Sequence, residues 1–159
     1  MKLYYLSILA FFFVSCLHKV SIHNFPQSKS QINYEKVKSE QNFRNKDLRF
    51  GSKQEFYFSG TFNNSEEYLI NLIKEVVKNE GFKIKKSDGQ QDFLIFEKGL
   101  SLEAWKSIIG IYYNINESTN SLEMYLLYQM TQDITGSFDI NFAEIIGMKI
   151  RYKLSSANN

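Results

Sequence analysis

The sequence contains very little cysteine, proline and histidine. Its 159 residues include one cysteine, Cys16, one proline, Pro26, and two histidines, His18 and His23. A single cysteine cannot form a disulfide within the chain, so folding depends on the core alone. No histidine or cysteine follows His23. This excludes Ser-His and Cys-His catalysis from the rest of the chain and removes the usual zinc ligands there.

The chain also lacks a strong charge of either sign and any nucleotide-binding motif. Nineteen Lys and Arg residues stand against 17 Asp and Glu residues, a formal net charge of +2. That balance is too weak for a general nucleic-acid-binding protein. Neither G-x-G-x-x-G nor P-loop spacing occurs. We therefore expect no nucleic-acid partner, no cofactor and no bound metal.

Residues 1–15 are typical of a signal peptide. Lys2 gives the positive start, and an apolar run follows from residue 3 to residue 14. This run is shorter than the roughly 20 residues that span a bilayer. It leads into Phe13-Val14-Ser15-Cys16. The tetrapeptide resembles the lipobox of bacterial lipoproteins, with Phe13 where leucine is usual.

The lipoprotein resemblance implies a modification and a location. The thiol of Cys16 would receive diacylglycerol, the chain would be cut before it, and the new N-terminus would be acylated with a fatty acid such as palmitate. The protein would then be exported and held at a membrane surface of the cell envelope. Two or three acyl chains make release very slow, since each buried CH₂ contributes about 0.8 kcal/mol. Ordinary secretion and an uncleaved membrane anchor are the alternatives.

The segment from residue 16 to residue 46 is rich in Ser, Lys, Asn and Gln. It has no lasting helical or strand periodicity, which predicts a flexible tether between the lipid and a domain at 47–159. A random coil of this length spans about 30 Å. Four apolar side chains interrupt it and are able to dock on the domain or on a partner: Phe25, Tyr34, Val37 and Phe43.

Residues 47–159 predict one α+β domain with an antiparallel sheet of about five strands packed on one helix. The helix is expected over 66–80, because Ser65 is a good N-cap and Gly81 a good terminator. Apolar alternation or continuous apolar runs predict the strands, at 53–62, 82–86, 93–97, 108–116 and 122–131. The segment 138–154 is ambiguous. It alternates like a strand, but its length favours a second helix with Ser137 as its cap.

Three aromatic residues are candidate binding residues. Trp105 lies in a predicted loop and is the candidate anchor, while Tyr113 and Tyr128 are candidates for stacking on a sugar or peptide. Tyrosines at strand spacing are equally typical of a core. The paired acids Asp88 and Asp92 form a candidate hydrolytic site, as do Asp133 and Asp139, although aspartate is also favoured in turns.

These features predict a membrane-anchored lipoprotein that is not an enzyme. Its domain would bind a protein partner in the envelope or serve a structural role there. The first alternative is a carrier of a small apolar ligand or a sugar. That reading requires a cavity, which would be lined by Phe93, Ile95, Tyr113 and Tyr128. The second alternative is a hydrolase using carboxylates alone, which requires two acids in one cleft.

Overall fold

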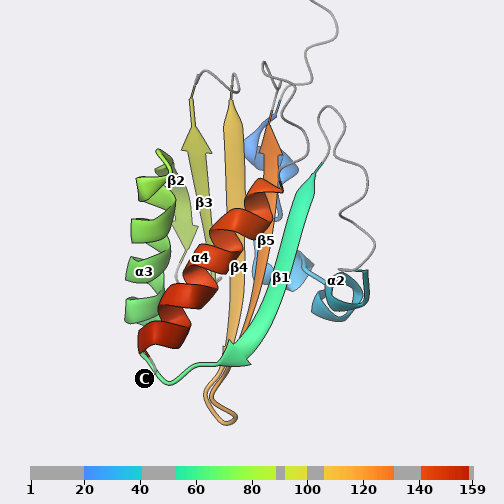
Figure 1. The fold of residues 1–159 in the computed structure, drawn as a ribbon. Coiled ribbons are helices and arrows are strands. Elements are labelled where there is room, and N and C mark those ends of the chain that lie inside the picture. Colours follow the sequence, from blue (N-terminus) through green and yellow to red (C-terminus); the bar gives the residue numbers. More distant parts are fainter. Residues whose placement is uncertain (1–19, 41–52, 89–91, 100–105, 131–140, 158–159) are drawn as a thin grey trace, which may run out of the picture.

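The computed structural model describes residues 20–40, 53–88, 92–99, 106–130 and 141–157. A five-stranded antiparallel sheet lies at its centre, in the order β1-β5-β4-β3-β2 (Figure 1). The strands are β1 Gln54–Thr61, β2 Lys83–Asp88, β3 Phe93–Lys98, β4 Ser107–Asn116 and β5 Ser121–Met130. The helices are α2 Tyr34–Glu40, α3 Glu66–Asn79 and α4 Phe142–Ala157, with short 3₁₀ turns η1 Ile22–Asn24 and η2 Lys29–Gln31. The predicted α+β class and the five antiparallel strands are confirmed.

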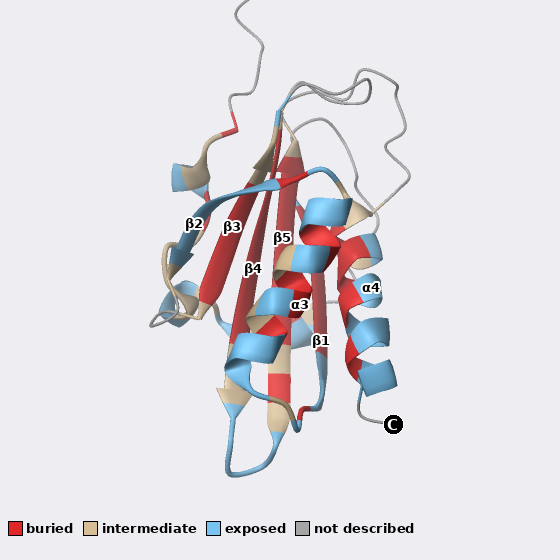
Figure 2. Ribbon diagram, turned by 90° about the vertical axis from the view of Figure 1, so that its left-hand side faces the viewer, coloured by how far each residue is buried: buried red, intermediate tan, exposed pale blue. Residues whose placement is uncertain are grey.

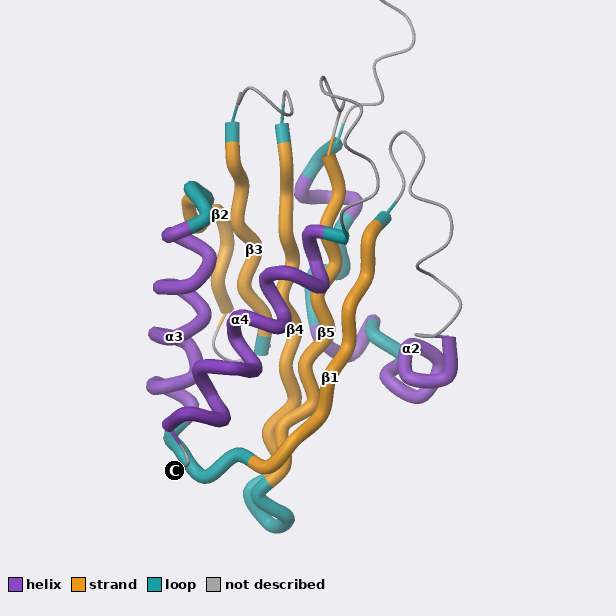
Figure 3. The backbone as a smooth tube through the Cα atoms, viewed as in Figure 1, coloured by secondary structure: helices purple, strands orange, loops and turns teal. Residues whose placement is uncertain are grey.

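The central strands are apolar on both faces of the sheet. In β4, Ile109 and Ile111 belong to one core, whereas Ile108 and Tyr112 belong to the other. All four side chains are fully buried. Because side chains alternate along a strand, this pattern requires a cover on each side of the sheet. The tube view in Figure 3 shows helices α3 and α4 in front of the sheet and the segment with α2 beside and behind it.

Helix α3 has the ends that its sequence predicts. The Ser65 hydroxyl accepts a hydrogen bond from the Tyr68 N–H and caps the first turn. Gly81 has φ +84°, the left-handed conformation that glycine adopts without strain. The N–H of Phe82 then donates to the Val77 carbonyl, and the Phe82 side chain joins the core. In this common type of helix C-terminus, the residue after the glycine donates a hydrogen bond back to the last turn.

The ambiguous C-terminal segment forms a helix over its described part, so the helical alternative is confirmed there. Helix α4 begins at Phe142. The Asn141 side chain accepts a hydrogen bond from the Glu144 N–H and takes the capping role. The predicted cap, Ser137, lies outside the described residues. Both α3 and α4 turn their buried sides to the same face of the sheet (Figure 2).

The opposite face of the sheet is covered by Val20–Glu40, here called the N-terminal segment. Val20 is 1%, Phe25 3% and Val37 9% exposed. They pack against one apolar face of the sheet: Tyr57, Phe93, Ile95, Ile108, Tyr112, Tyr125 and Leu127. The apolar side chains of residues 20–40 and this face of the sheet form a core of their own, here called the second core. The structure therefore differs from the predicted flexible tether at residues 20–40. The remaining parts of that prediction, residues 16–19 and 41–46, lie outside the described residues.

Candidate functional site

The two candidate tyrosines are core residues. Tyr113 is 1% and Tyr128 6% exposed, both on the face covered by α3 and α4. The Tyr113 hydroxyl donates to Glu66 at 3.0 Å, and the Tyr128 hydroxyl donates to Ser107 at 3.0 Å. Burial raises the pKa of the Tyr113 phenol, and its hydrogen bond to Glu66 raises it further. Neither tyrosine ring is therefore open for stacking on a ligand. The other two candidate residues, Cys16 and Trp105, lie outside the described residues.

The residues expected to line a carrier cavity lie on opposite sides of the sheet. Phe93 and Ile95 face the N-terminal segment, whereas Tyr113 and Tyr128 face the helices. One cavity cannot contain all four, since the backbone of the sheet separates them. The sequence revealed their apolar character but not the face that each residue occupies.

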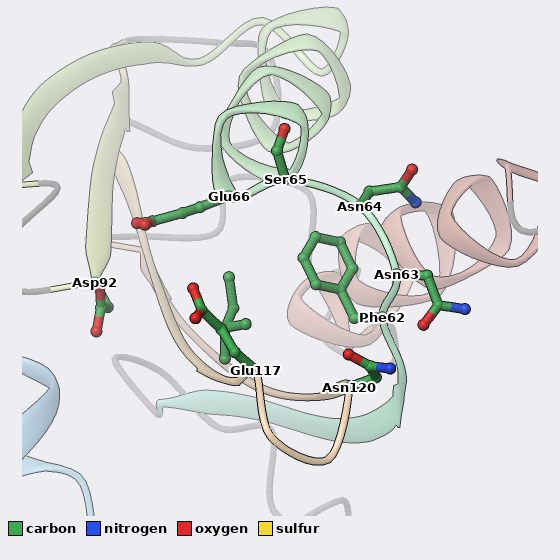
Figure 4. A pocket seen from close by; sticks show the side chains of 9 residues that line it. Phe62, Asn63, Asn64, Ser65, Glu66, Asp92, Glu117 and Asn120 are labelled. Atoms are coloured by element: carbon green, nitrogen blue, oxygen red, sulfur yellow. The ribbon is translucent and has the colours of Figure 1, made fainter.

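A pocket of about 480 Å³ lies at the end of the sheet where the β4–β5 turn is found. It is formed by the connection from β1 to α3, the first turn of α3, the β4–β5 turn and the residue before β3. Its lining residues are Phe62, Asn63, Asn64, Ser65, Glu66, Asp92, Ile115, Glu117 and Asn120. Figure 4 shows the side chains of Glu66 and Glu117 reaching into the space between α3 and this turn.

Two of the three carboxylates in the pocket take part in the fold itself. Glu66 accepts the hydrogen bond from Tyr113. Asp92 forms an ion pair with Lys29 of the N-terminal segment, and the Lys29 ammonium also contacts the Asn114 side-chain oxygen at 3.5 Å. Glu117 is exposed in the β4–β5 turn. The pocket therefore offers carboxylate and amide groups to a ligand rich in hydroxyl or amine donors.

The structure does not gather the predicted acid pairs in this pocket. Asp92 lines it, but Asp88 is paired with Phe93 across the β2–β3 ladder and is not a lining residue. Asp133 and Asp139 lie outside the described residues. Within the described ranges, no three His, Cys, Asp or Glu side chains are grouped to hold a metal ion. The same ranges contain no helix with the length and apolar character needed to cross a bilayer.

Helix α4 carries a second candidate surface. Ile145 is 36%, Met148 48% and Tyr152 76% exposed, and their spacing places them in one row on the helix. We call these three side chains the α4 row. The buried side of α4 is formed by Ala143, Ile146, Gly147, Ile150 and Leu154. The signal for the row was the i, i+3, i+7 spacing.

Ion pairs fix the direction in which the α4 row faces. Lys149 pairs with Glu80, and Lys153 pairs with Glu75 at 2.7 Å. Both acids belong to α3 or its C-cap, so this flank of α4 is occupied. On an ideal helix the α4 row lies opposite the buried side and about 90° from the flank of Lys149 and Lys153, so it faces away from the sheet.

Comparison with known proteins adds no family to this picture. No protein-family model matches the sequence, and no curated protein matches it either.

Proposed function

We propose that this chain is an exported, lipid-anchored protein whose domain binds a protein partner in the cell envelope. The anchor rests on the apolar leader followed by Phe13-Val14-Ser15-Cys16. The observation that carries partner binding is the α4 row, with Tyr152 more than three-quarters exposed. Single exposed apolar residues are ordinary on protein surfaces, but a row that includes an aromatic residue is typical of an interface.

The chemistry of the α4 row defines the partner. Its centre is apolar, and Arg151 is exposed one residue before Tyr152. A complementary surface would be apolar at its centre with an acidic group at its rim, because rim charges steer the encounter. A structural role in the envelope is compatible with the same contact.

Capture from detergent-solubilised membranes tests the proposal. The bait is the full chain, and the test variant carries Met148→Ser and Tyr152→Ser. The matched control carries Ile84→Ser and Tyr68→Ser, which removes two similarly apolar side chains that are 38% and 37% exposed elsewhere. We expect the test variant to lose at least about 30-fold in affinity, the loss typical of a central interface residue, and the control to keep the partner.

The anchor is tested separately on the natural protein. Intact-mass analysis should find a chain that begins at Cys16 and carries diacylglycerol, and Cys16→Ala should abolish the modification and membrane retention. Recovery of no partner, together with a sugar or lipid bound to the purified chain, would replace partner binding by the carrier alternative.

The polar pocket favours a second candidate function, binding of a sugar or an amine-bearing ligand. Carboxylates and amides are the groups that orient such ligands, and a pocket of about 480 Å³ accommodates a monosaccharide. Titration of the full chain with a panel of neutral and amino sugars, monitored by calorimetry, tests this function. Glu117→Gln should weaken binding, whereas Glu67→Gln should leave it unchanged, because Glu67 does not line the pocket. Equal affinities for the two variants would reject the site.

A further inference from the structure

The N-terminal segment is attached to the sheet by contacts along its length. The Phe25 ring packs above Gly110, where an added Cβ would lie only 3.0 Å from it. The Tyr112 hydroxyl donates to the Pro26 carbonyl at 2.8 Å. Further along, Lys29 pairs with Asp92. Because Phe25 lies at Gly110 and Lys29 reaches the Asn114 side chain, the segment follows β4 in the same direction, toward the pocket.

The start of the segment consequently lies near the opposite end of the sheet, where β4 begins. Figure 1 shows η1 beside the ends of β4 and β5 that lie farthest from the β4–β5 turn. Val20, the first described residue, is 1% exposed and belongs to the second core. The chain is thus held by the domain from residue 20 onwards.

Only three residues lie between Val20 and the proposed lipid attachment at Cys16, so the two Cα atoms are four residue steps apart. Four residues of extended chain span at most about 14 Å. The distance along β4 from Ser107 to Ile115 is about 27 Å, because each residue of an antiparallel strand advances about 3.4 Å. A lipid on Cys16 therefore keeps the start of β4 close to the bilayer, and the β4–β5 turn lies farther from it.

We propose that the docked N-terminal segment holds the domain on the membrane in one orientation, with the start of β4 facing the bilayer and the β4–β5 turn facing away. This inference rests on the proposed lipid anchor and replaces the expected free tether by a short, directed one. The polar pocket then lies at the outer end of the domain. A partner or ligand would approach it from outside the membrane surface.

Two glycines provide matched labelling positions. Gly99 follows β3 at the membrane end, since Lys98 is paired with Ser107 at the start of β4. Gly60 lies in β1 at the outer end, through the pairing of Gly60 with Leu122. Both are exposed, and an added Cβ at either position meets no atom of the described residues within 4 Å. With Cys16 bearing the lipid, Gly99→Cys or Gly60→Cys supplies a single free thiol for a fluorescent donor.

Energy transfer to acceptors on lipid headgroups tests the orientation. The full lipidated chain is bound to vesicles of phosphatidylethanolamine and phosphatidylglycerol. We expect transfer from the Gly99 position to be about fivefold or more faster than from the Gly60 position, because roughly 27 Å of strand separates them. Equal rates, or faster transfer from Gly60, would overturn the inference.

A linker insertion tests whether the docked segment causes the orientation. Twenty Gly and Ser residues placed between Lys19 and Val20 leave every described contact intact and add about 25 Å of flexible chain. The difference between the two labels should then disappear, and its persistence would overturn the role of the segment. A chain with a bare Cys16 would overturn the lipid anchor and this inference together. A lipidated, vesicle-bound chain with equal transfer would overturn the inference alone.

Discussion

Gly147 allows helix α4 to approach the sheet closely. A Cβ built on Gly147 would lie 2.2 Å from the Cδ1 atom and 2.5 Å from the Cε1 atom of Phe56. These ring atoms belong to a buried side chain of β1, which also neighbours Phe58 at a centroid distance of 6.1 Å. The ring therefore has little room to move away. Glycine serves here as a packing residue, although it lowers helix propensity.

Replacing Gly147 by alanine has two opposite effects on stability, one from helix propensity and one from the clash with Phe56. Helix propensity alone would stabilise Gly147→Ala by about 1 kcal/mol. The clash with Phe56 should dominate, and we expect a net loss of about 1–3 kcal/mol in the free energy of unfolding. Urea denaturation measures the change, with Gly99→Ala as the control because its Cβ meets no atom of the described part of the chain within 4 Å. An increase in stability for Gly147→Ala would show that the close contact is relaxed in solution.

Two tyrosines of the second core should respond oppositely to loss of their hydroxyl. The Tyr112 hydroxyl donates to Pro26, so Tyr112→Phe should cost about 1 kcal/mol. The Tyr34 hydroxyl is buried and has no hydrogen-bond partner among the described residues. Tyr34→Phe should therefore leave stability unchanged or raise it by up to about 1 kcal/mol. Both values come from the same denaturation series, and a loss for Tyr34→Phe as large as that for Tyr112→Phe would reveal a partner for Tyr34.

The N-terminal segment should open separately from the helices. Its contacts with the sheet are side-chain contacts, whereas the strands are joined by a continuous backbone ladder. We expect Phe25→Ser to increase hydrogen exchange at least about tenfold in residues 20–40 and to leave α3 and α4 protected, since local unfolding removes only the weakest unit. His23→Ser is the control, because His23 is exposed in the same segment. Uniform loss of protection across the domain would mean that the segment and the sheet unfold together.

The helices and strands were largely readable from the sequence because their signals are local. Ser65 and Gly81 mark the ends of α3, and the continuous apolar run of β3 marks a strand covered on both faces. Docking of Phe25, Tyr34 and Val37 on the domain was one of the possibilities, but the sequence favoured a flexible tether, since the short 3₁₀ turns leave no periodicity. The attachment of the N-terminal segment depends on the contact between Phe25 and Gly110, which are 85 positions apart.

The pocket could not be predicted from the sequence either. Asn63, Asn64 and Asp92 are residue types that favour turns, but nothing in the sequence indicates that their segments meet. The sheet register brings them together with Glu117 from the β4–β5 turn. Local residue patterns predict elements well, whereas a site built from three separate segments requires the tertiary arrangement.

The domain as a whole should lose stability at alkaline pH, because both of its cores contain buried phenols. Burial raises the pKa of Tyr34, Tyr112 and Tyr113 above the ordinary value of 10. Above pH 10 the unfolded chain releases these protons while the folded chain retains them. The stability that they contribute is therefore complete below pH 10 and is lost as the pH rises further.

Each such phenol should lower the free energy of unfolding by up to about 1.4 kcal/mol per pH unit above pH 10. Three phenols give a limiting slope of about 4 kcal/mol per unit. Urea denaturation between pH 8 and pH 11.5 measures it, and Tyr34→Phe should reduce the slope by up to about 1.4 kcal/mol per pH unit, because one titrating group is removed. A flat profile above pH 10 would mean that the phenols titrate without unfolding the protein, so that both cores admit water more readily than their burial implies.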